Sequence, residues 1–434
     1  MSDGKSIVIV GAGLAGLCCA RTLQRAGFDA RIYEASDDVG GRVRTDIMEG
    51  YKLDRGFQVL FTAYPAIKQE IKQEALKLAP FDPGAVIFYA GQRFELGDPL
   101  RKPLELFQAA FSPLLITRDK LRVLRLRREL RKMSVSDIFK MHDKDMESYL
   151  RAFGFKHRFL DRFIRPFYAG IFLDRSLRTS VRMFAFTFKM LSEGQIALPA
   201  AGMGEMAQQI ARDLKPDTLF LNTPVQALLR EGKRVTGIRL QNGETVLADQ
   251  VVVATSADVA ADLTGLDLPQ EHRSVACLYF SLPERLYRQK KIMLFPDPNP
   301  YAGDDPYVNN AALLTNIAPS YAPAGKHLLS VTVLGNPLIS DEELAEQCKA
   351  EIAPHFRKVR PETWRLLRVY RIRWAQFAQP VGIFDRIPDT ETETPGLILA
   401  GEITVSSSLH GALVSGQRAA ALAMSYAADA ELKK

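Results

Sequence analysis

Short runs of consecutive apolar residues recur along the chain and predict strands that are buried on both faces. The first run is Ile7 to Val10; residues 30–33 (ARIY) give a second short strand that includes one charged residue, and residues 251–255 and 397–400 repeat the apolar run far along the sequence. β-Branched residues dominate the first and third runs, which is typical of a parallel sheet covered by helices. A helical pattern over residues 14–26 follows the first run directly. We therefore predict an α/β fold built on a parallel sheet.

Other patterns fill the chain between these runs. Residues 100–190 carry many helical signals and few strand signals, which predicts a helical insertion. Strand patterns predominate from about residue 274 to residue 379, with helical material between 342 and 355. These strands suit a mixed sheet that forms the floor or wall of a substrate cavity. Smaller predicted elements are an amphipathic helix over 64–77 and hairpins over 86–94 and 235–247, with turns at Ala90-Gly91 and Asn242-Gly243.

The composition is that of an ordinary globular protein, with 47% hydrophobic and 25% charged residues. Lysine and arginine outnumber aspartate and glutamate by 57 to 50, and the resulting net charge of +7 favours an anionic membrane surface or an acidic ligand. Residues 118–132 form the densest basic run, and Val123, Leu126 and Leu130 share one face of the helix predicted there. Such a helix either lies on an anionic membrane or is a solvated helix with a core-facing stripe. No other feature of the sequence supports a nucleic-acid partner.

The sequence shows no targeting or disulfide pattern. Its polar start, MSDGKS, runs directly into the first strand and is unlike a secretory signal peptide. No apolar run approaches the roughly 20 residues of a membrane-spanning helix. The four cysteines form neither a disulfide framework nor a metal cluster, and the six histidines lack metal-ligand spacing. We expect a cytoplasmic protein without a metal site, associated with a membrane where the basic helix makes contact.

Three glycines follow the first strand at the spacing G-x-G-x-x-G. Gly11 permits a tight turn from strand to helix, Gly13 lets the backbone approach a pyrophosphate, and Gly16 lets helix and strand pack closely. The pyrophosphate then lies over unpaired N–H groups at the positive end of the helix dipole. Glu34 ends the second strand, 18 residues beyond Gly16, where a carboxylate accepts hydrogen bonds from an adenosine ribose and repels a 2′-phosphate. The sequence therefore predicts a dinucleotide site that disfavours NADP.

A second glycine-rich loop makes the motif more specific. In Gly40-Gly41-Arg42 the backbone can again come close to a ligand, and the arginine suits a pyrophosphate or an electron-rich ring. The order G-x-G-x-x-G, Glu, G-G-R resembles the amino-terminal signature of the flavin amine oxidase, phytoene desaturase and protoporphyrinogen oxidase superfamily. Residues 53–58 (LDRGFQ) and 159–206 are similar to further segments of these families, so the resemblance covers essentially the whole chain. The middle segment looks most like the phytoene desaturase-type members.

The resemblance implies that FAD lies along the whole set of motifs. In these families the Val225 position meets the adenine, the Ala254 position passes near the pyrophosphate, and the Glu402 carboxylate bonds the ribityl or pyrophosphate region. The loop over 405–412 then enters a final helix whose positive end faces the flavin. The predicted FAD-binding residues are Gly11, Ala12, Gly13, Leu14, Ala15, Gly16, Glu34, Gly40, Gly41, Arg42, Gly56, Phe57, Gln58, Val225, Ala254, Gly401, Glu402, Leu409, His410, Gly411 and Ala412.

The same resemblance divides the chain into two discontinuous domains. A Rossmann-like FAD-binding domain comprises residues 1–80, 200–265 and 385–434. A substrate domain of mixed β-sheet comprises residues 81–199 and 266–384, with the helical insertion at 100–190 inside it. Ten phenylalanines and tyrosines between residues 153 and 188 pack in the core, and we expect a few of them to line an apolar tunnel.

The chain itself shows no catalytic constellation, which agrees with an enzyme whose cofactor carries the electron chemistry. His410 lies in the loop expected over the flavin, where a neutral imidazole would bond the substrate or relay a proton. The alternative is a structural histidine packed between domains. Trp374 begins a segment that leads toward the flavin in these families, and Tyr168 lies in the aromatic middle segment. These three are the candidate catalytic residues.

We predict an FAD-dependent oxidoreductase that desaturates or dehydrogenates a hydrophobic, polyisoprenoid or carotenoid-like substrate by hydride transfer to flavin N5. Oxygen or a quinone is the expected electron acceptor. Ser408 stands where monoamine-type oxidases carry an aromatic residue that walls the amine, which weakens an amine-oxidase interpretation. The alternatives are an amine or amino-acid oxidase, a redox-neutral flavin isomerase or mutase, and a non-catalytic prenyl-binding carrier on the same fold. Such carriers have degraded phosphate-binding features, whereas both glycine loops and Glu402 are intact here.

Overall fold

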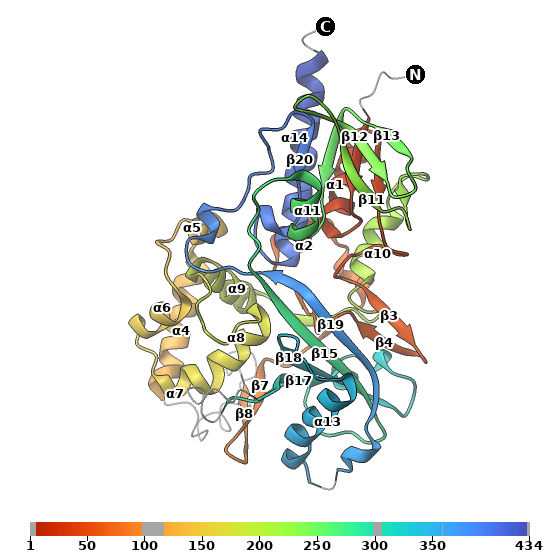
Figure 1. The fold of residues 1–434 in the computed structure, drawn as a ribbon. Coiled ribbons are helices and arrows are strands. Elements are labelled where there is room, and N and C mark those ends of the chain that lie inside the picture. Colours follow the sequence, from red (N-terminus) through yellow and green to blue (C-terminus); the bar gives the residue numbers. More distant parts are fainter. Residues whose placement is uncertain (1–5, 98–116, 298–305, 358, 432–434) are drawn as a thin grey trace.

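Strands from distant parts of the chain meet in one parallel sheet. The computed structural model describes residues 6–97, 117–297, 306–357 and 359–431 (Figure 1). The sheet has the order β10-β2-β1-β14-β20, formed by Leu219–Phe220, Ala30–Tyr33, Ile7–Val10, Gln250–Val253 and Leu397–Leu399. Neighbouring strands are parallel throughout. The predicted α/β fold with a parallel sheet is therefore confirmed.

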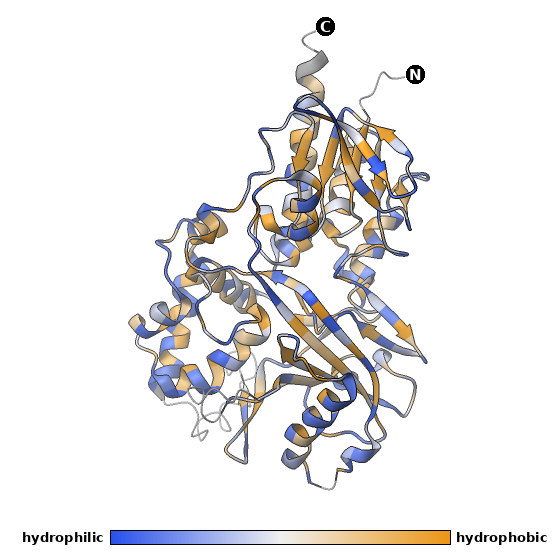
Figure 2. Cartoon of the chain, viewed as in Figure 1, coloured by the Kyte–Doolittle hydropathy of each residue, from blue (hydrophilic) through white to orange (hydrophobic). Residues whose placement is uncertain are grey.

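Both faces of this sheet are covered, which explains the unbroken apolar run of its central strand β1. Ile7 and Ile9 face the two helices α1 and α14, which pack against each other. Val8 and Val10 face a three-stranded sheet, β11-β12-β13. A strand covered on both sides needs apolar residues at every position, and Figure 2 shows the central strands in hydrophobic colours. The covering elements are α1 (Leu14–Arg25), α14 (Leu409–Glu431), β11 (Val225–Glu231), β12 (Arg234–Leu240) and β13 (Thr245–Leu247).

The predicted mixed sheet is present, with the strand order β19-β15-β18-β17-β16-β7-β8. Its strands are Arg365–Phe377, His272–Leu282, His327–Leu334, Val308–Leu313, Ile292–Leu294, Gly84–Tyr89 and Gln92–Gly97. Helix α13 (Asp341–Ile352) covers one face, while residues of the opposite face, such as Cys277 and Tyr279, join the main core. The predicted turn Ala90-Gly91 joins β7 to β8 with positive φ at both residues, as a tight hairpin turn requires.

The described part of the helical insertion is helical, as predicted. It comprises α4 (Thr117–Lys132), α5 (Val135–Phe139), α6 (Met146–Ala152), α7 (His157–Phe159), the π-helical turn η3 (Leu160–Ile164), α8 (Arg165–Phe172) and α9 (Val181–Glu193). Residues 100–116 of the prediction lie outside the described residues. Figure 1 shows these helices beside the β7-β8 hairpin, at one side of the molecule. Across the described ranges, no helix has both the length and the apolar composition needed to cross a bilayer.

Short elements connect these layers. They are β3 (Thr45–Met48), β4 (Tyr51–Asp54), β5 (Leu60–Phe61), β6 (Ala79–Pro80), β9 (Ile196–Leu198), α10 (Glu205–Arg212), α11 (Ala257–Thr264) and α12 (Leu314–Ile317), with 3₁₀ turns η4 (Pro319–Tyr321), η5 (Ala353–His355), η6 (Pro361–Thr363), η7 (Ile383–Asp385) and η8 (Glu402–Thr404). The two sheets draw their strands from the segments predicted for the two domains, and the domain limits themselves stay a prediction.

The amphipathic helix predicted over residues 64–77 is wrong in its length. The structure has α2 (Pro65–Glu70) and, after a break, the 3₁₀ turn η1 (Gln73–Leu76). At the break the Lys72 N–H donates to Gln209 Oε1 at 2.7 Å, and the Lys72 carbonyl accepts from Gln209 Nε2 at 3.2 Å. A side-chain amide of α10 thus takes the backbone groups that a continuing helix would use. Tertiary contact overrides the helical pattern here.

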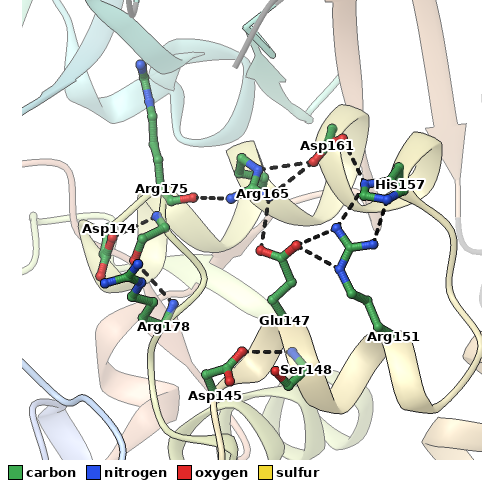
Figure 3. Close-up of polar contacts among 11 residues, drawn as sticks. Asp145, Glu147, Ser148, Arg151, His157, Asp161, Arg165, Asp174, Arg175 and Arg178 are labelled. Atoms are coloured by element: carbon green, nitrogen blue, oxygen red, sulfur yellow. Dashed lines mark hydrogen bonds and ion pairs between the residues drawn. The ribbon is translucent and has the colours of Figure 1, made fainter. Parts of the chain in front are cut away.

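An ionic network fixes the position of α8 in the helical insertion. Figure 3 shows Arg165, the first residue of α8, between Asp161 and Glu147. Its Nη2 lies 3.1 Å from Asp161 Oδ1 and 3.2 Å from Glu147 Oε2, and its Nη1 donates to the Arg175 carbonyl at 2.6 Å. Glu147 also accepts from Arg151 at 2.5 Å. The Arg165 side chain is only 14% exposed, so these charge-assisted bonds are partly shielded from water.

We expect the substitution Arg165→Met to lower the free energy of unfolding by about 2 kcal/mol, because two carboxylates and a carbonyl lose their shared donor. Urea denaturation measures this change, and limited proteolysis reports opening of the helical insertion. The matched control is Arg158→Met, since Arg158 lies seven residues earlier and is exposed. Equal stability of the two variants would contradict the structural role of the network.

Candidate functional site

A cavity of about 730 Å³ begins at the carboxyl ends of the parallel strands and continues toward the mixed sheet and the helical insertion. Its first part is lined by residues that end or directly follow strands, namely Val10, Tyr33, Ala254 and Gly401. Side chains of β17, β18 and β19 and of the helices α8 and α9 line its second part. Ligands of open α/β sheets bind outside the carboxyl ends of the strands. The cavity therefore joins a cofactor position to a substrate position.

The glycine turn after β1 has the geometry that its spacing predicts. Gly11 has a φ of +102°, a conformation that favours glycine. A Cβ at Gly16 would stand 2.0 Å from the Gly11 carbonyl oxygen, so helix and strand approach as closely as their backbones allow. A Cβ at Gly13 would meet nothing within 4 Å, because this residue borders the cavity. No side chain caps the first turn of α1, so its N–H groups remain available to an anion.

The Glu34 carboxylate is held rigidly at the end of β2. Its Oε2 accepts from the Ala12 N–H at 2.7 Å, and its Oε1 accepts from the Ser36 N–H at 2.9 Å and from Ser36 Oγ at 2.6 Å. Glu34 also lines the cavity. A negative charge fixed at this point remains suited to a ribose and repels a 2′-phosphate.

The second glycine loop brings three distant segments together. The Gly40 N–H donates to the Ala12 carbonyl at 2.8 Å, which ties this loop to the first one. Arg42 Nη1 donates to Glu402 Oε1 at 2.5 Å and to the Ala375 carbonyl at 2.9 Å. Gln58 Nε2 in turn donates to the Arg42 carbonyl at 2.7 Å. Glu402, which follows β20, thus pairs with Arg42. Arg42 in turn contacts the backbone of Ala375, next to Trp374.

Sequence reasoning missed one wall at the end of the cavity near Val225. Thr255, Ser256, Val259 and Leu263 line this wall from α11 and the turn before it. Val259 remains 42% exposed although its neighbours on β14 are buried. An apolar residue left open beside a cofactor groove was the only available signal, and it is invisible before the fold is known.

The second part of the cavity is largely apolar. The aromatic residues on its wall include Phe163, Phe167 and Phe172 of the ten that the sequence analysis singled out, and the other seven pack elsewhere. Aliphatic and sulfur side chains complete the wall: Ile171, Met183, Leu191, Ile196 and Ile292. A few uncharged polar residues stand among them, namely Thr187, Asn310, Thr332 and Gln376. This lining offers contact area and little charge.

Two candidate catalytic residues lie away from the cavity wall. His410 is 8% exposed, its Nδ1 accepts from the Ala66 N–H at 3.2 Å, and its ring stacks near Tyr64 and Phe186. It therefore caps the first turn of α2, and burial lowers the pKa of His410 to about 4, with Arg418 adding to the effect. Tyr168 is 2% exposed and packs among the rings of the helical insertion. Neither side chain borders the cavity, so the structure does not bring them to a reacting position.

Trp374 is the candidate that does border the cavity. Its indole stacks on His272 with ring centroids 4.4 Å apart, and the two rings lie 19° from parallel. His272 belongs to the neighbouring strand β15, so a cross-strand pair holds the indole in place. Of the predicted cofactor residues, all border the cavity except Ala12, Gly16, His410 and Gly411. Ala12 and Gly16 act through the backbone, and a Cβ at Gly411 would stand 2.1 Å from the Ser406 carbonyl oxygen.

The buried Asp54 carboxylate packs behind residues 55–58; it lies in the LDRGFQ segment but is not among the predicted site residues. Asp54 accepts from Thr45 Oγ1 at 2.5 Å, from the Met203 N–H at 2.9 Å and from the Tyr321 hydroxyl at 3.0 Å. The Tyr279 hydroxyl donates to the Asp54 carbonyl at 2.8 Å. Burial raises the pKa of Asp54 to about 6. The network clamps the start of the segment that carries Phe57 and Gln58 along the cavity.

The residues of the first part fit FAD. The backbone is open to a pyrophosphate at Gly13, and a free helix N-terminus lies beside it. Gly40 and Gly41 both have positive φ and bring a second stretch of backbone to the same groove. The groove then continues past Arg42 and Glu402 to the start of α14, which presents the positive end of a second helix through Leu409 and Ala412.

Comparison with known proteins agrees with this site. The model of a family described as flavin containing amine oxidoreductase matches residues 14–424. Among curated proteins, the L-amino-acid oxidases of Crotalus adamanteus and Bungarus fasciatus are each 42% identical, over 80 and 82 residues. Each match covers 18% of this chain and 16% of the relative, so it spans about a sixth of those curated proteins.

Solved structures show the same fold over the whole chain. A protein named as a protoporphyrinogen oxidase from Exiguobacterium sp. 255-15 has a TM-score of 0.74 at 21% identity, covering 100% of both chains. An oxidoreductase from Methanosarcina mazei has a TM-score of 0.72 at 15% identity, covering 97% of this chain and 100% of the other. A putrescine oxidase bound to putrescine has a TM-score of 0.70 at 18% identity, covering 97% and 99%. At these identities the likeness shows the fold.

We expect Gly13→Val to weaken FAD binding by at least about 100-fold, because its side chain would occupy the place where the backbone meets the pyrophosphate. The apoprotein should keep its thermal midpoint, since no atom of the described residues lies within 4 Å of the added Cβ. Fluorescence titration with FAD and circular dichroism of the apoprotein measure the two effects. Gly16→Ala is the contrasting variant, because its Cβ clashes with the Gly11 carbonyl and should destabilise the apoprotein itself. A Gly13→Val protein that binds FAD normally would refute this arrangement.

We also expect the free energy of unfolding to fall in acid, because the buried His410 ring must then take up a proton. Its pKa is about 4 in the folded protein and 6.5 in the unfolded chain, so the unfolded state binds the extra proton first. Stability contributed by the neutral ring is present above pH 6.5 and is lost as pH falls toward 4. Between pH 7 and pH 5 the wild type should lose about 2 kcal/mol more than His410→Gln, which keeps an acceptor for the Ala66 N–H. Urea denaturation at both pH values gives the difference, and identical pH slopes would show that His410 is not held neutral.

Proposed function

Given that the chain belongs to the flavin containing amine oxidoreductase family and is therefore an FAD-dependent oxidoreductase, we propose that it dehydrogenates a hydrophobic substrate of the polyisoprenoid or carotenoid type. The family assignment confirms the resemblance read from the motifs at the level of the superfamily. The substrate class rests on one observation: among the described residues that line the cavity, every charged side chain already has a partner within the protein.

Each charged residue on this wall is already engaged. Glu34 is held by backbone and hydroxyl donors, and Arg42 is paired with Glu402. Arg55 pairs with Asp46 at 3.0 Å, and Asp82 is not free either. An ammonium or carboxylate substrate would have to break one of these pairs to find a partner, whereas an apolar substrate needs none. The cost of burying an unpaired charge favours the apolar substrate.

The shape of the wall supports the same substrate class. Ser408, which lines the cavity, leaves open the side where an amine oxidase places an aromatic ring. Phe163, Phe167 and Phe172 of the helical insertion offer flat apolar surfaces along the opposite part of the cavity. Such rings bury large areas without requiring a polar partner and suit a flat polyene.

In this proposal the chain's own residues bind the cofactor, orient the substrate and shield the reacting carbon from water. FAD supplies the hydride-accepting ring, which no side chain replaces. Trp374, fixed by His272, forms a rigid wall beside the substrate position. The N-terminus of α14 provides positive potential where negative charge would develop on reduction. The apolar lining excludes water from the reacting carbon, and oxygen or a quinone then serves as the electron acceptor.

Anaerobic mixing of the holoenzyme with candidate substrates tests the proposal. We expect isoprenoid polyenes to bleach the visible flavin absorbance, while amines and amino acids leave it unchanged. Readmitting oxygen or a soluble quinone then identifies the acceptor by the speed at which the absorbance returns. Bleaching by amines and not by any isoprenoid would overturn the proposal.

An amine or amino-acid oxidase is the second candidate. The L-amino-acid oxidases that match 80 residues of this chain favour it. Peroxide release with a panel of amines and L-amino acids in air would support it. A zwitterionic substrate would also require the Arg42–Glu402 or Arg55–Asp46 pair to separate, so activity should then rise in variants that lack Asp46 or fall in variants that lack Arg55.

We expect Phe167→Ala to lower kcat/KM for a hydrophobic substrate by about 10- to 100-fold, the loss for one buried aromatic ring. Phe188→Ala is the matched control, because Phe188 is a half-buried ring of the same insertion that does not line the cavity. It should alter stability and leave kcat/KM within about twofold. Steady-state kinetics with both variants measures the contrast, and equal losses would place the substrate elsewhere.

A further inference from the structure

The positive charge of the chain is concentrated in the helical insertion. Residues 117–193 contain nineteen lysines and arginines and nine aspartates and glutamates, a net charge of +10, whereas the whole chain carries +7. The rest of the protein is therefore slightly negative. Such an uneven distribution orients the molecule in the field of a charged surface.

Helix α4 carries this charge on a face that nothing in the described protein covers. Leu126 and Leu130 on its inward face are each 1% exposed and pack into the main core. On the outward face Leu121 is 62% exposed and Leu124 is 40% exposed. The exposed cations around these leucines are Arg118, Arg125, Arg128, Arg131 and Lys132, of which Arg125 pairs with Glu129 at 2.7 Å. Positions 121, 128 and 132 follow one line along the helix, so leucine and cations share a single stripe.

The outward face is not required to hold α4 in place. Arg127 Nη2 donates to the Ser192 carbonyl at 3.0 Å, and Lys189 Nζ donates to the Arg131 carbonyl at 2.9 Å. These bonds and the buried leucines attach α4 to α9, and Met183 and Leu191 of α9 line the cavity. Figure 1 shows α4 on the outer side of the insertion, with α9 between it and the middle of the molecule.

We propose that the outward face of α4 docks the protein on an anionic lipid bilayer. Arg118, Arg128, Arg131 and Lys132 contact the lipid headgroups, and Leu121 and Leu124 enter the boundary between headgroups and acyl chains. A nucleic acid or an acidic protein would use the cations alone, whereas the exposed leucines between them match the layered chemistry of a bilayer surface. Docking places the apolar cavity one helix away from the membrane.

Vesicle sedimentation with the purified holoenzyme tests the proposal. We expect binding to vesicles of phosphatidylcholine with phosphatidylglycerol, weak binding to phosphatidylcholine alone, and release at high salt. Arg128→Gln/Lys132→Gln should lower the partition coefficient about 30-fold, because each basic residue near the surface contributes about a factor of five. Leu121→Ser/Leu124→Ser should weaken binding while leaving its salt dependence unchanged.

The matched control is Lys233→Gln/Arg239→Gln, which removes two exposed cations from β12 and the turn before it, at the other end of the molecule. It should bind vesicles like the wild type. Equal binding to neutral and anionic vesicles, or equal losses in the α4 and β12 variants, would overturn the proposal. Retention by DNA or by an acidic polypeptide without vesicle binding would also overturn it and assign the surface to that partner.

The docking proposal depends on the outward face of α4 and is independent of which substrate the cavity takes. The α4 variants should therefore keep wild-type flavin content and wild-type bleaching with a soluble short isoprenoid, while losing turnover of a substrate delivered in anionic vesicles. Vesicle binding without isoprenoid bleaching would refute the proposed function and leave the docking intact. Bleaching by isoprenoids without vesicle binding would refute the docking and leave the proposed function intact.

Discussion

A helix can approach the strand before it only as closely as their side chains allow, and at Gly16 there is no side chain. A Cβ there would stand 2.0 Å from the Gly11 carbonyl oxygen. Gly416 allows an equally close approach between two helices, because its Cβ in α14 would stand 2.3 Å from the Ala15 carbonyl oxygen in α1. These two close contacts set how near α1 packs to β1 and how near α14 packs to α1, and the first turns of both helices border the cavity. The two positive helix ends that face a bound anion or a reduced ring therefore depend on two absent side chains.

The parts of the fold that were predictable are those that the local sequence determines alone. Ile7 to Val10 must be covered on both faces, since every residue is apolar, and the glycine spacing after it admits few conformations. The Ala90-Gly91 turn is local in the same sense. Residues such as Glu34, Arg42 and Glu402 were predictable because family motifs carry them, and the structure brings them to one groove although up to 368 positions separate them.

The remaining features depend on contacts that no local pattern encodes. The helix predicted over 64–77 breaks because Gln209 takes the backbone groups of Lys72. His410 stands beside residues that line the cavity, yet helical periodicity turns it toward Ala66, and Tyr168 is likewise turned into the packed rings. Asp54 gained its role only through Tyr321 and Met203, which lie far along the chain. For His410 and Tyr168 the position was predictable and the direction of the side chain was not.

The order of strands in the parallel sheet has a consequence for how the protein is made. Ile7 pairs with Gln250, and β14 pairs with β20 near residue 398. At about 5–20 residues per second, a ribosome needs roughly 10 to 50 s after β1 to deliver its first long-range partner. During that time β1, which is apolar on both faces, has only β2 beside it in the sheet, because β14 has not yet been made. The nascent chain is thus exposed to misassembly until β20 has been made, and the cavity is complete only once α14 has left the ribosome.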